Sequence, residues 1–240
     1  MPAFLVHGVP DTHRLWDPLR SHLRRTEVVA PSLPGFGTPL PPGFAATKEA
    51  YVDWLVGEIA RLGEPVDLVG HDWGSLFVQR IASIRPDLVR TWACGNGAVD
   101  AEYVWHDMAR QWQTPGVGEE IMATMTGEPL EAGLVGAGLP PAVARETARH
   151  VDDRMKDAIL RLYRSAVHVG REWQPDLERV RRPALVLWGR EDPFVPPVFA
   201  ERLAERVHGE LVLFEGCGHW WAVERAAEAA AALERFWARV

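Results

Sequence analysis

Six short apolar runs, each followed by glycine or proline and then a helix-like segment, constrain the fold of this chain most strongly. They are apolar throughout rather than alternating, which is typical of parallel strands covered on both faces. The runs are AFLVHG (3–8), EVVAPS (27–32), VDLVG (66–70), TWACG (91–95), ALVLWG (184–189) and ELVLFEG (210–216). Helical patterns lie at 16–24, 48–62, 75–84, 198–205 and 222–240. This alternation predicts an α/β fold with a mostly parallel sheet of about six strands flanked by helices.

One long interval interrupts this alternation. Residues 96–176 contain no convincing strand pattern, but helical stretches occur at 103–112 and 151–169. An insertion between two strands, at the sheet edge where their carboxyl ends gather, is well placed to cover a site. We therefore predict a core of residues 1–96 and 176–240 with a helical cap, or lid, of residues 97–175. A helical domain that only adds stability is the alternative.

Composition limits the partners. The 240 residues carry a formal net charge of −7, which argues against nucleic acid or an anionic membrane surface as a partner. The chain has only two cysteines and no apolar stretch long enough to span a membrane, and its first residues do not resemble a signal peptide. We expect a cytoplasmic protein, monomeric or homodimeric, with reduced thiols.

The stretch VDLVGHDWGSLF (66–77) predicts a sharp turn between a buried strand and a helix. Gly70 and Gly74 flank Asp72, so the backbone can pass closely while the side chain of Asp72 points up from the sheet. A carboxylate near a helix amino end stays ionised, which suits a nucleophile. A simple N-cap role for Asp72 is the alternative. Ser75 lies one helical step beyond the turn and is not expected to be a nucleophile.

Three further loops carry groups that such a nucleophile needs. HGVP (7–10) follows a strand, and the main-chain N–H groups of Val9 and Trp73 would form an oxyanion hole. His7 is expected to hold the turn rather than act as a base. Asp192 in LWGREDPFVPP and His219 in EGCGHWWAVE each follow a strand. The order nucleophile, acid, histidine predicts a triad of Asp72, Asp192 and His219.

These motifs resemble the α/β-hydrolase fold over nearly the whole chain, and we expect a shortened version of that fold in which the strand before HGVP is the first. GHDWG (70–74) is similar to the turn of the epoxide hydrolases and haloalkane dehalogenases, which use an aspartate to attack carbon. HGVP fits the epoxide hydrolases. Fluoroacetate dehalogenases carry Arg after the aspartate, whereas this chain has Trp73. Asp100 is the second choice for the orienting acid, because some members place that acid after the preceding strand.

The resemblance implies roles for the aromatic residues of the interval. Epoxide hydrolases place two lid tyrosines over the epoxide oxygen, and RLYRSA (161–166) resembles the segment that carries one of them, which implies that role for Tyr163. Tyr103 is the weaker match for the second tyrosine. Packing of both rings within helices is the alternative. Trp73, Trp105 and Trp112 are expected to form apolar walls around the substrate.

The predicted reaction is hydrolysis of a small apolar epoxide to a vicinal diol through an ester on Asp72, with no metal and no other cofactor. A haloalkane dehalogenase with the same triad is an alternative, in which Trp73 and a second donor such as Trp105 or Trp112 bind halide. Asn96, the only asparagine, is placed less naturally for that role. A non-catalytic protein that binds small molecules is a further alternative.

Overall fold

The computed structural model describes all residues, 1–240, and contains one parallel sheet of six strands in the order β2-β1-β3-β4-β5-β6. The strands are β1 (Ala3–Val6), β2 (Val28–Val29), β3 (Val66–His71), β4 (Val89–Gly95), β5 (Ala184–Gly189) and β6 (Glu210–Phe214). The strands β1, β3 and β5 are buried along their whole length, as continuous apolar runs predict. The predicted α/β architecture with six parallel strands is therefore confirmed.

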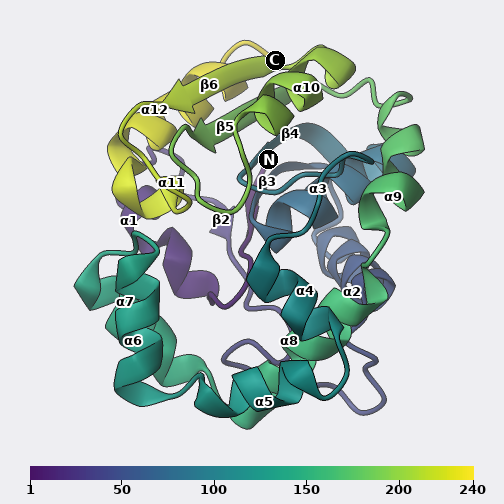
Figure 1. Ribbon diagram of the computed structural model, residues 1–240. Helices are drawn as coiled ribbons and strands as arrows, with labels where there is room; N and C mark the ends of the chain where they lie inside the picture. Colours follow the sequence, from purple (N-terminus) through teal and green to yellow (C-terminus); the bar gives the residue numbers. More distant parts are fainter.

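Helices cover both faces of this sheet. The α-helices of the core are α1 (Asp17–Arg20), α2 (Lys48–Ala60), α3 (Trp73–Ile84), α10 (Val198–Val207), α11 (Trp221–Glu224) and α12 (Ala226–Trp237), with 3₁₀ turns η1 (His13–Trp16) and η2 (Pro86–Leu88). The helices α1, α11 and α12 pack together on one side of the sheet, whereas α2 and α3 pack together on the other (Figure 1). The sheet is thus enclosed between two helical layers, which accounts for its apolar strands.

Between β4 and β5 the chain forms six helices and no strand. They are α4 (Asp107–Gln113), α5 (Val117–Thr124), α6 (Gly127–Gly136), α7 (Pro141–His150), α8 (Asp153–Ser165) and α9 (Val169–Leu177). The helices α4 to α8 gather at one end of the sheet, in the lower half of Figure 1, while α9 packs back against α3. This arrangement places most of the interval over the ends of the central strands.

Several predicted element bounds were wrong. The strand expected at 27–32 has only two residues, because Pro31 lacks an N–H group and cannot continue the ladder. The helix expected at 16–24 is two short turns that end at Arg20. The helix expected at 222–240 breaks at Arg225, which has non-helical backbone angles. The stretches at 103–112 and 151–169 begin as helices only at Asp107 and Asp153.

Three further observations concern the cysteines, membrane-spanning helices and metal ligands. Both cysteines, Cys94 and Cys217, are buried and free. No helix of the chain has the length and apolar character needed to cross a membrane. No three His, Cys, Asp or Glu side chains are grouped so that they would hold a metal ion.

A buried carboxylate fastens the amino end of β3 to its surroundings. One oxygen of Asp67 accepts hydrogen bonds from Thr91 Oγ1 at 2.6 Å and from Arg90 Nε at 2.8 Å. The other accepts from Arg90 Nη2 at 2.5 Å and from Arg25. Arg25 also lies over the ring of Trp237 in α12. The carboxylate therefore connects β3 and β4 with the last helix of the chain.

We expect Asp67→Asn to destabilise the fold without changing the site at the opposite end of β3. The amide keeps the shape of the side chain but leaves two arginines without their charge partner, and breaking such a buried pair costs about 3 kcal/mol. Urea denaturation measures the free energy of unfolding. A loss below about 1 kcal/mol would show that the network contributes little.

Candidate active site

Asp72 stands at a strained turn between β3 and α3. Its φ of 53° and ψ of −120° lie in a region that non-glycine residues rarely adopt. A Cβ on Gly70 would lie 2.2 Å from Gly74 O, and a Cβ on Gly74 would lie 1.9 Å from Val6 O. The glycines are therefore required by close backbone contact, which holds Asp72 at the tip of the turn.

The side chain of Asp72 points away from its own helix. It makes no capping hydrogen bond to α3, so the N-cap alternative is wrong. Its Oδ1 instead accepts a hydrogen bond from the main-chain N–H of Val9, with N and O 2.7 Å apart. The N–H of Trp73, at the first position of α3, has no carbonyl partner within the helix. Val9 thus contacts the carboxylate where an oxyanion donor would be needed.

His7 keeps the turn before Val9 in place. The ring is fully buried, and its Nδ1 hydrogen bonds with Gly8 O at 2.8 Å. Leu33 N donates to Nε2 at 2.9 Å. Both ring nitrogens are thus used by backbone groups, in agreement with the predicted structural role.

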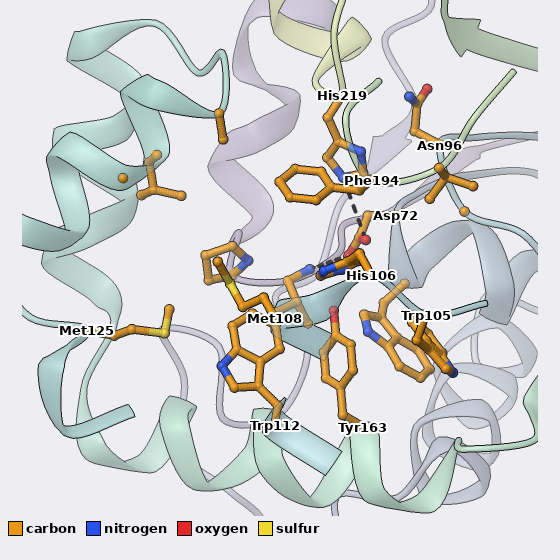
Figure 2. A pocket seen from close by; sticks show the side chains of 18 of the residues that line it. Asp72, Asn96, Trp105, His106, Met108, Trp112, Met125, Tyr163, Phe194 and His219 are labelled. Carbon is orange, nitrogen blue, oxygen red and sulfur yellow. Dashed lines mark hydrogen bonds and ion pairs between the residues drawn. The ribbon is translucent and has the colours of Figure 1, made fainter. Parts of the chain in front are cut away.

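Asp192, after β5, and His219, after β6, meet Asp72 at the carboxyl end of the sheet. The Nδ1 of His219 lies 2.9 Å from Asp192 Oδ2. Its Nε2 lies 3.6 Å from Asp72 Oδ2, the ion pair drawn as a dashed line in Figure 2. Asp192 and His219 are buried, whereas 17% of the Asp72 side chain is exposed to the cavity. The structure therefore brings the three predicted triad residues together in the order carboxylate, imidazole, carboxylate.

Asp192 is held as an acceptor on both oxygens. The main-chain N–H groups of Phe194 and Val195 donate to Oδ1 at 2.7 and 3.2 Å, and Asn96 Nδ2 donates to Oδ2 at 2.5 Å. Burial alone would raise the pKa of Asp192, but the charge and hydrogen bond of His219 outweigh it and lower that pKa. Asp192 therefore remains a carboxylate that orients the imidazole.

Asn96 has a place that the sequence did not reveal. Its amide nitrogen donates to Asp192, while its Oδ1 accepts from the N–H of Gly189 at 3.1 Å. Asn96 is fully buried and has a φ of 54°, which asparagine tolerates better than most residues. The side chain thus supports the acid.

The two carboxylates set the charge of His219. Burial disfavours the imidazolium, but the charges and hydrogen bonds of Asp192 and Asp72 outweigh it and raise the pKa of His219 to about 10. In the free site at neutral pH the imidazole is therefore protonated between two carboxylates. Loss of the Asp72 charge would remove one of the groups that raise the pKa of His219.

Asp100 does not serve as an alternative acid. Its carboxylate is buried but lies 3.2 Å from Arg202 and 3.3 Å from Arg206 of α10. These ion pairs direct it toward α10, while Asp192 occupies the position beside His219. The geometry therefore favours Asp192 over Asp100 as the acid that orients His219.

A cavity of about 360 Å³ opens above Asp72, and its lining is mainly apolar. The lining residues from the interval after β4 include Tyr103, Trp105, His106, Met108, Trp112, Ile121, Met125, Leu130, Leu134 and Tyr163. Apart from Asp72, His219, His106 and the two tyrosines, the lining has no ionisable group. Such a cavity suits a small uncharged molecule.

The two tyrosines that line the cavity differ in their hydroxyl contacts. Tyr163, on α8, packs edge-to-face against Trp73 and Trp112, and Figure 2 shows its hydroxyl directed toward Asp72. Burial, followed by the charge of Asp72, raises the pKa of Tyr163 well above its ordinary value, so the hydroxyl keeps its proton. The hydroxyl of Tyr103 donates to Phe194 O at 3.3 Å instead. Tyr163 is thus the better placed proton donor.

The indole rings also differ. Trp105 stacks on Trp73, with ring centroids 5.7 Å apart, and its Nε1 donates to Ala166 O at 3.3 Å. The Nε1 atoms of Trp73 and Trp112 are buried and have no hydrogen-bond partner. Both indoles belong to residues that line the cavity, so a bound group that approached them could accept a hydrogen bond from these donors.

His106 is a cavity residue for which the sequence contained no motif. Its ring lies between Trp112 and Phe194, with centroids 6.5 and 5.0 Å away. Burial lowers the pKa of His106, which keeps its imidazole neutral. Only the path of the chain before α4 brings this residue to the site.

Comparison with known proteins agrees with this fold. Residues 3–233 match the model of the alpha/beta hydrolase family, and the chain belongs to that family. It is 24% identical to the (E)-2-((N-methylformamido)methylene)succinate hydrolase of Acinetobacter baylyi over 221 residues, which cover 91% of this chain and 83% of that protein. It is 39% identical to epoxide hydrolase 2 of Siraitia grosvenorii over 98 residues, 37% of this chain and 30% of that protein.

Among solved structures, haloalkane dehalogenase DbeA from Bradyrhizobium elkani superposes with a TM-score of 0.80 at 22% identity. The match covers all of this chain and 92% of that chain. At this identity the likeness establishes the shared fold.

We expect Gly8→Ala to disable the site while the fold persists. A Cβ on Gly8 would lie 2.1 Å from Asp72 Oδ1, so it would push the carboxylate away from the N–H of Val9. Loss of an oxyanion donor costs roughly 10²- to 10³-fold in turnover. Steady-state kinetics measures the loss for any substrate that the wild-type chain turns over.

Gly57→Ala is the matched control for that experiment. Gly57 lies within α2, and a Cβ there meets nothing within 4 Å. Its alanine variant should keep full activity and gain slightly in stability, by roughly 0.5–1 kcal/mol. Equal activity of the two alanine variants would contradict the proposed contact between Gly8 and the carboxylate.

Proposed function

We propose that this member of the alpha/beta hydrolase family hydrolyses epoxides to vicinal diols through an ester on Asp72. One observation carries the proposal: a carboxylate occupies the nucleophile turn, with Val9 N–H on one oxygen and His219 near the other. A carboxylate suits attack at saturated carbon, because attack on an ester would produce an anhydride. The partial likeness to epoxide hydrolase 2 of Siraitia grosvenorii supports the same proposed function.

In the first step Asp72 Oδ2 attacks one carbon of the epoxide, and the bond from that carbon to the ring oxygen breaks. Tyr163, whose hydroxyl points toward Asp72, gives its proton to the departing oxygen. This leaves an ester on Asp72 and a phenolate on Tyr163. The hydroxyl of Tyr103 can act as a second donor only if it first leaves the main-chain oxygen of Phe194.

In the second step His219 takes a proton from water, whose oxygen attacks the ester carbon of Asp72. The esterified Asp72 no longer carries a charge, so the pKa of His219 falls and the imidazolium releases its extra proton to solvent, which leaves a neutral base until Asp72 is charged again. Val9 N–H, together with Trp73 N–H, stabilises the oxyanion. The ester then breaks, His219 returns its proton to the alcohol oxygen, and the acid proton of Asp72 returns to Tyr163. The net change is addition of water to the epoxide.

The helices after β4 act as a lid in this proposal. They supply most of the apolar lining and the proton donor, while the core supplies the nucleophile, acid and base. The substrate is accordingly small, uncharged and largely apolar. No cofactor takes part in either step.

We expect His219→Gln to stop the reaction at the ester. Ester formation does not use the imidazole, whereas its hydrolysis loses a general base that contributes on the order of 10²- to 10⁴-fold. After incubation with a panel of epoxides, intact-mass spectrometry should show the protein heavier by the full mass of one epoxide.

The double variant Asp72→Asn with His219→Gln is the control and should gain no mass. A His219→Gln protein that never gains mass with any epoxide or alkyl halide would contradict covalent catalysis. It would favour the alternative of a non-catalytic binding protein with the same fold.

A haloalkane dehalogenase is the second candidate, favoured by the unpaired Nε1 atoms of Trp73 and Trp112 in the cavity lining. Two indole N–H donors would stabilise a halide as it leaves the carbon that Asp72 attacks. The same triad would then hydrolyse the ester. In the first candidate Tyr163 protonates the leaving oxygen. In the second, the indole N–H groups of Trp73 and Trp112 stabilise the leaving halide.

Two conservative variants separate the candidates. Tyr163→Phe should lower epoxide turnover at least about 10²-fold, because it removes a general acid, while Trp112→Phe should leave it nearly unchanged. The opposite pattern, measured as halide release from haloalkanes, would identify a dehalogenase. Epoxide opening that survives Tyr163→Phe would remove Tyr163 from the mechanism.

A further inference from the structure

A second buried polar pair lies directly behind the base. Asp11, four residues after His7, and His71, just before Asp72, are both almost completely buried, at 1% and 0% exposure. Neither takes part in the two proposed chemical steps. Burying a carboxyl group and an imidazole costs free energy unless both groups are hydrogen-bonded, so their contacts need an explanation.

Both residues contact the loop that carries the base. The Nε2 of His71 hydrogen bonds with the main-chain oxygen of His219 at 2.9 Å, and the two rings pack edge-to-face with centroids 4.8 Å apart. The indole Nε1 of Trp220 donates to Asp11 Oδ2 at 3.2 Å. Consecutive residues of the base loop are thus held by one group from the nucleophile turn and one from the turn that carries Val9.

The opposite side of the same loop is held separately. The carboxylate of Glu224 accepts hydrogen bonds from the N–H groups of Gly218 and Trp220, at 2.9 and 3.0 Å. These two residues flank His219. With Glu224 on one side, contacts from Asp11 and His71 complete the restraint of the loop, because a loop fixed at one side alone can still rotate.

We propose that Asp11 and His71 are positioning residues that hold the His219–Trp220 backbone so that Nε2 of His219 faces the ester on Asp72. This inference rests on the proposed covalent mechanism. It assigns the pair to the second step alone, since the attack of Asp72 on the substrate does not use His219.

The hydrogen bonds also specify where the pair keeps its proton. Nε2 of His71 faces a carbonyl and must carry hydrogen, so Nδ1 of a neutral ring has a lone pair. This Nδ1 is buried without a partner, and Asp11 Oδ2 lies 4.0 Å from it. Burial lowers the pKa of His71 to about 4, and burial and the charge of Asp72 raise the pKa of Asp11 to about 7. The other charged group that faces Asp11 is His219.

A neutral carboxylic acid at Asp11 fits this arrangement below neutral pH. Its proton avoids the repulsion that a carboxylate would have with the Nδ1 lone pair and with Asp72. The neutral acid still has an oxygen that accepts the hydrogen bond from Trp220 Nε1. An amide has the same donor and acceptor capacity as the neutral acid, so Asp11→Asn should retain the function of Asp11.

The test compares the two half-reactions by intact mass. In Asp11→Leu and in His71→Leu, we expect the ester on Asp72 to form at nearly the wild-type rate and to hydrolyse at least tenfold more slowly, so that it accumulates. Asp11→Asn and His71→Gln, which keep the hydrogen-bonding groups, should restore hydrolysis. A merely structural role would lower both half-reactions together.

Two further variants serve as controls for the positioning role. Asp67→Asn also removes a buried carboxylate, at the far end of β3, and should lose stability without accumulating ester. Trp220→Phe keeps a ring but removes the N–H that contacts Asp11, and it should accumulate ester even where Asp11→Leu does not fold. An ester seen by mass also proves that the variant is folded.

Each outcome decides a separate point. Ester in His219→Gln, but in none of the leucine variants or Trp220→Phe, would overturn the positioning role and leave the proposed function intact. No ester in any variant, His219→Gln included, would overturn the proposed function and this inference with it. Asp11→Asn that accumulates ester like Asp11→Leu would overturn the neutral-acid arrangement.

Discussion

The backbone contacts around Asp72 are the constraint on which the site depends. Gly70, Gly74 and Gly8 leave no room for a Cβ, and the turn holds Asp72 at a positive φ. This strain is maintained because β3 is hydrogen-bonded on both sides, to β1 and β4, and is buried along its length. A rigid sheet therefore converts close packing into a fixed direction for one carboxylate.

From that position the site is assembled by neighbouring strand ends. Parallel strands deliver Val9, Asp72, Asp192 and His219 to one edge, each on a short loop after a strand. The charge of the base follows from its two carboxylate partners, which outweigh the effect of burial. Two carboxylates hold His219 as an imidazolium at rest, and esterification of one of them would release a neutral base. The charge state of the base is thus linked to the progress of the proposed reaction.

The parts of the site that the sequence revealed are those whose contacts are local. The flanking glycines, the strand before them and the helix after them identify the turn at Asp72. Loops after β5 and β6 identify Asp192 and His219, because parallel strands end at one edge. The support for these residues could not be predicted from the sequence, because Asn96, Asp11 and His71 act through partners that are distant in sequence. The predicted bounds of the helices between β4 and β5 were wrong for a similar reason, since tertiary packing overrides local propensity.

By itself the sequence determined the parallel α/β architecture and the order of the chemical groups. Apolar runs and glycine turns act over a few residues, and this is why they can be read directly. Only the tertiary structure decided which groups meet. It paired Asp100 with α10 and Asp192 with His219, and it turned the Tyr103 hydroxyl to a carbonyl. Such choices depend on distances between segments far apart in the chain, which no local pattern encodes.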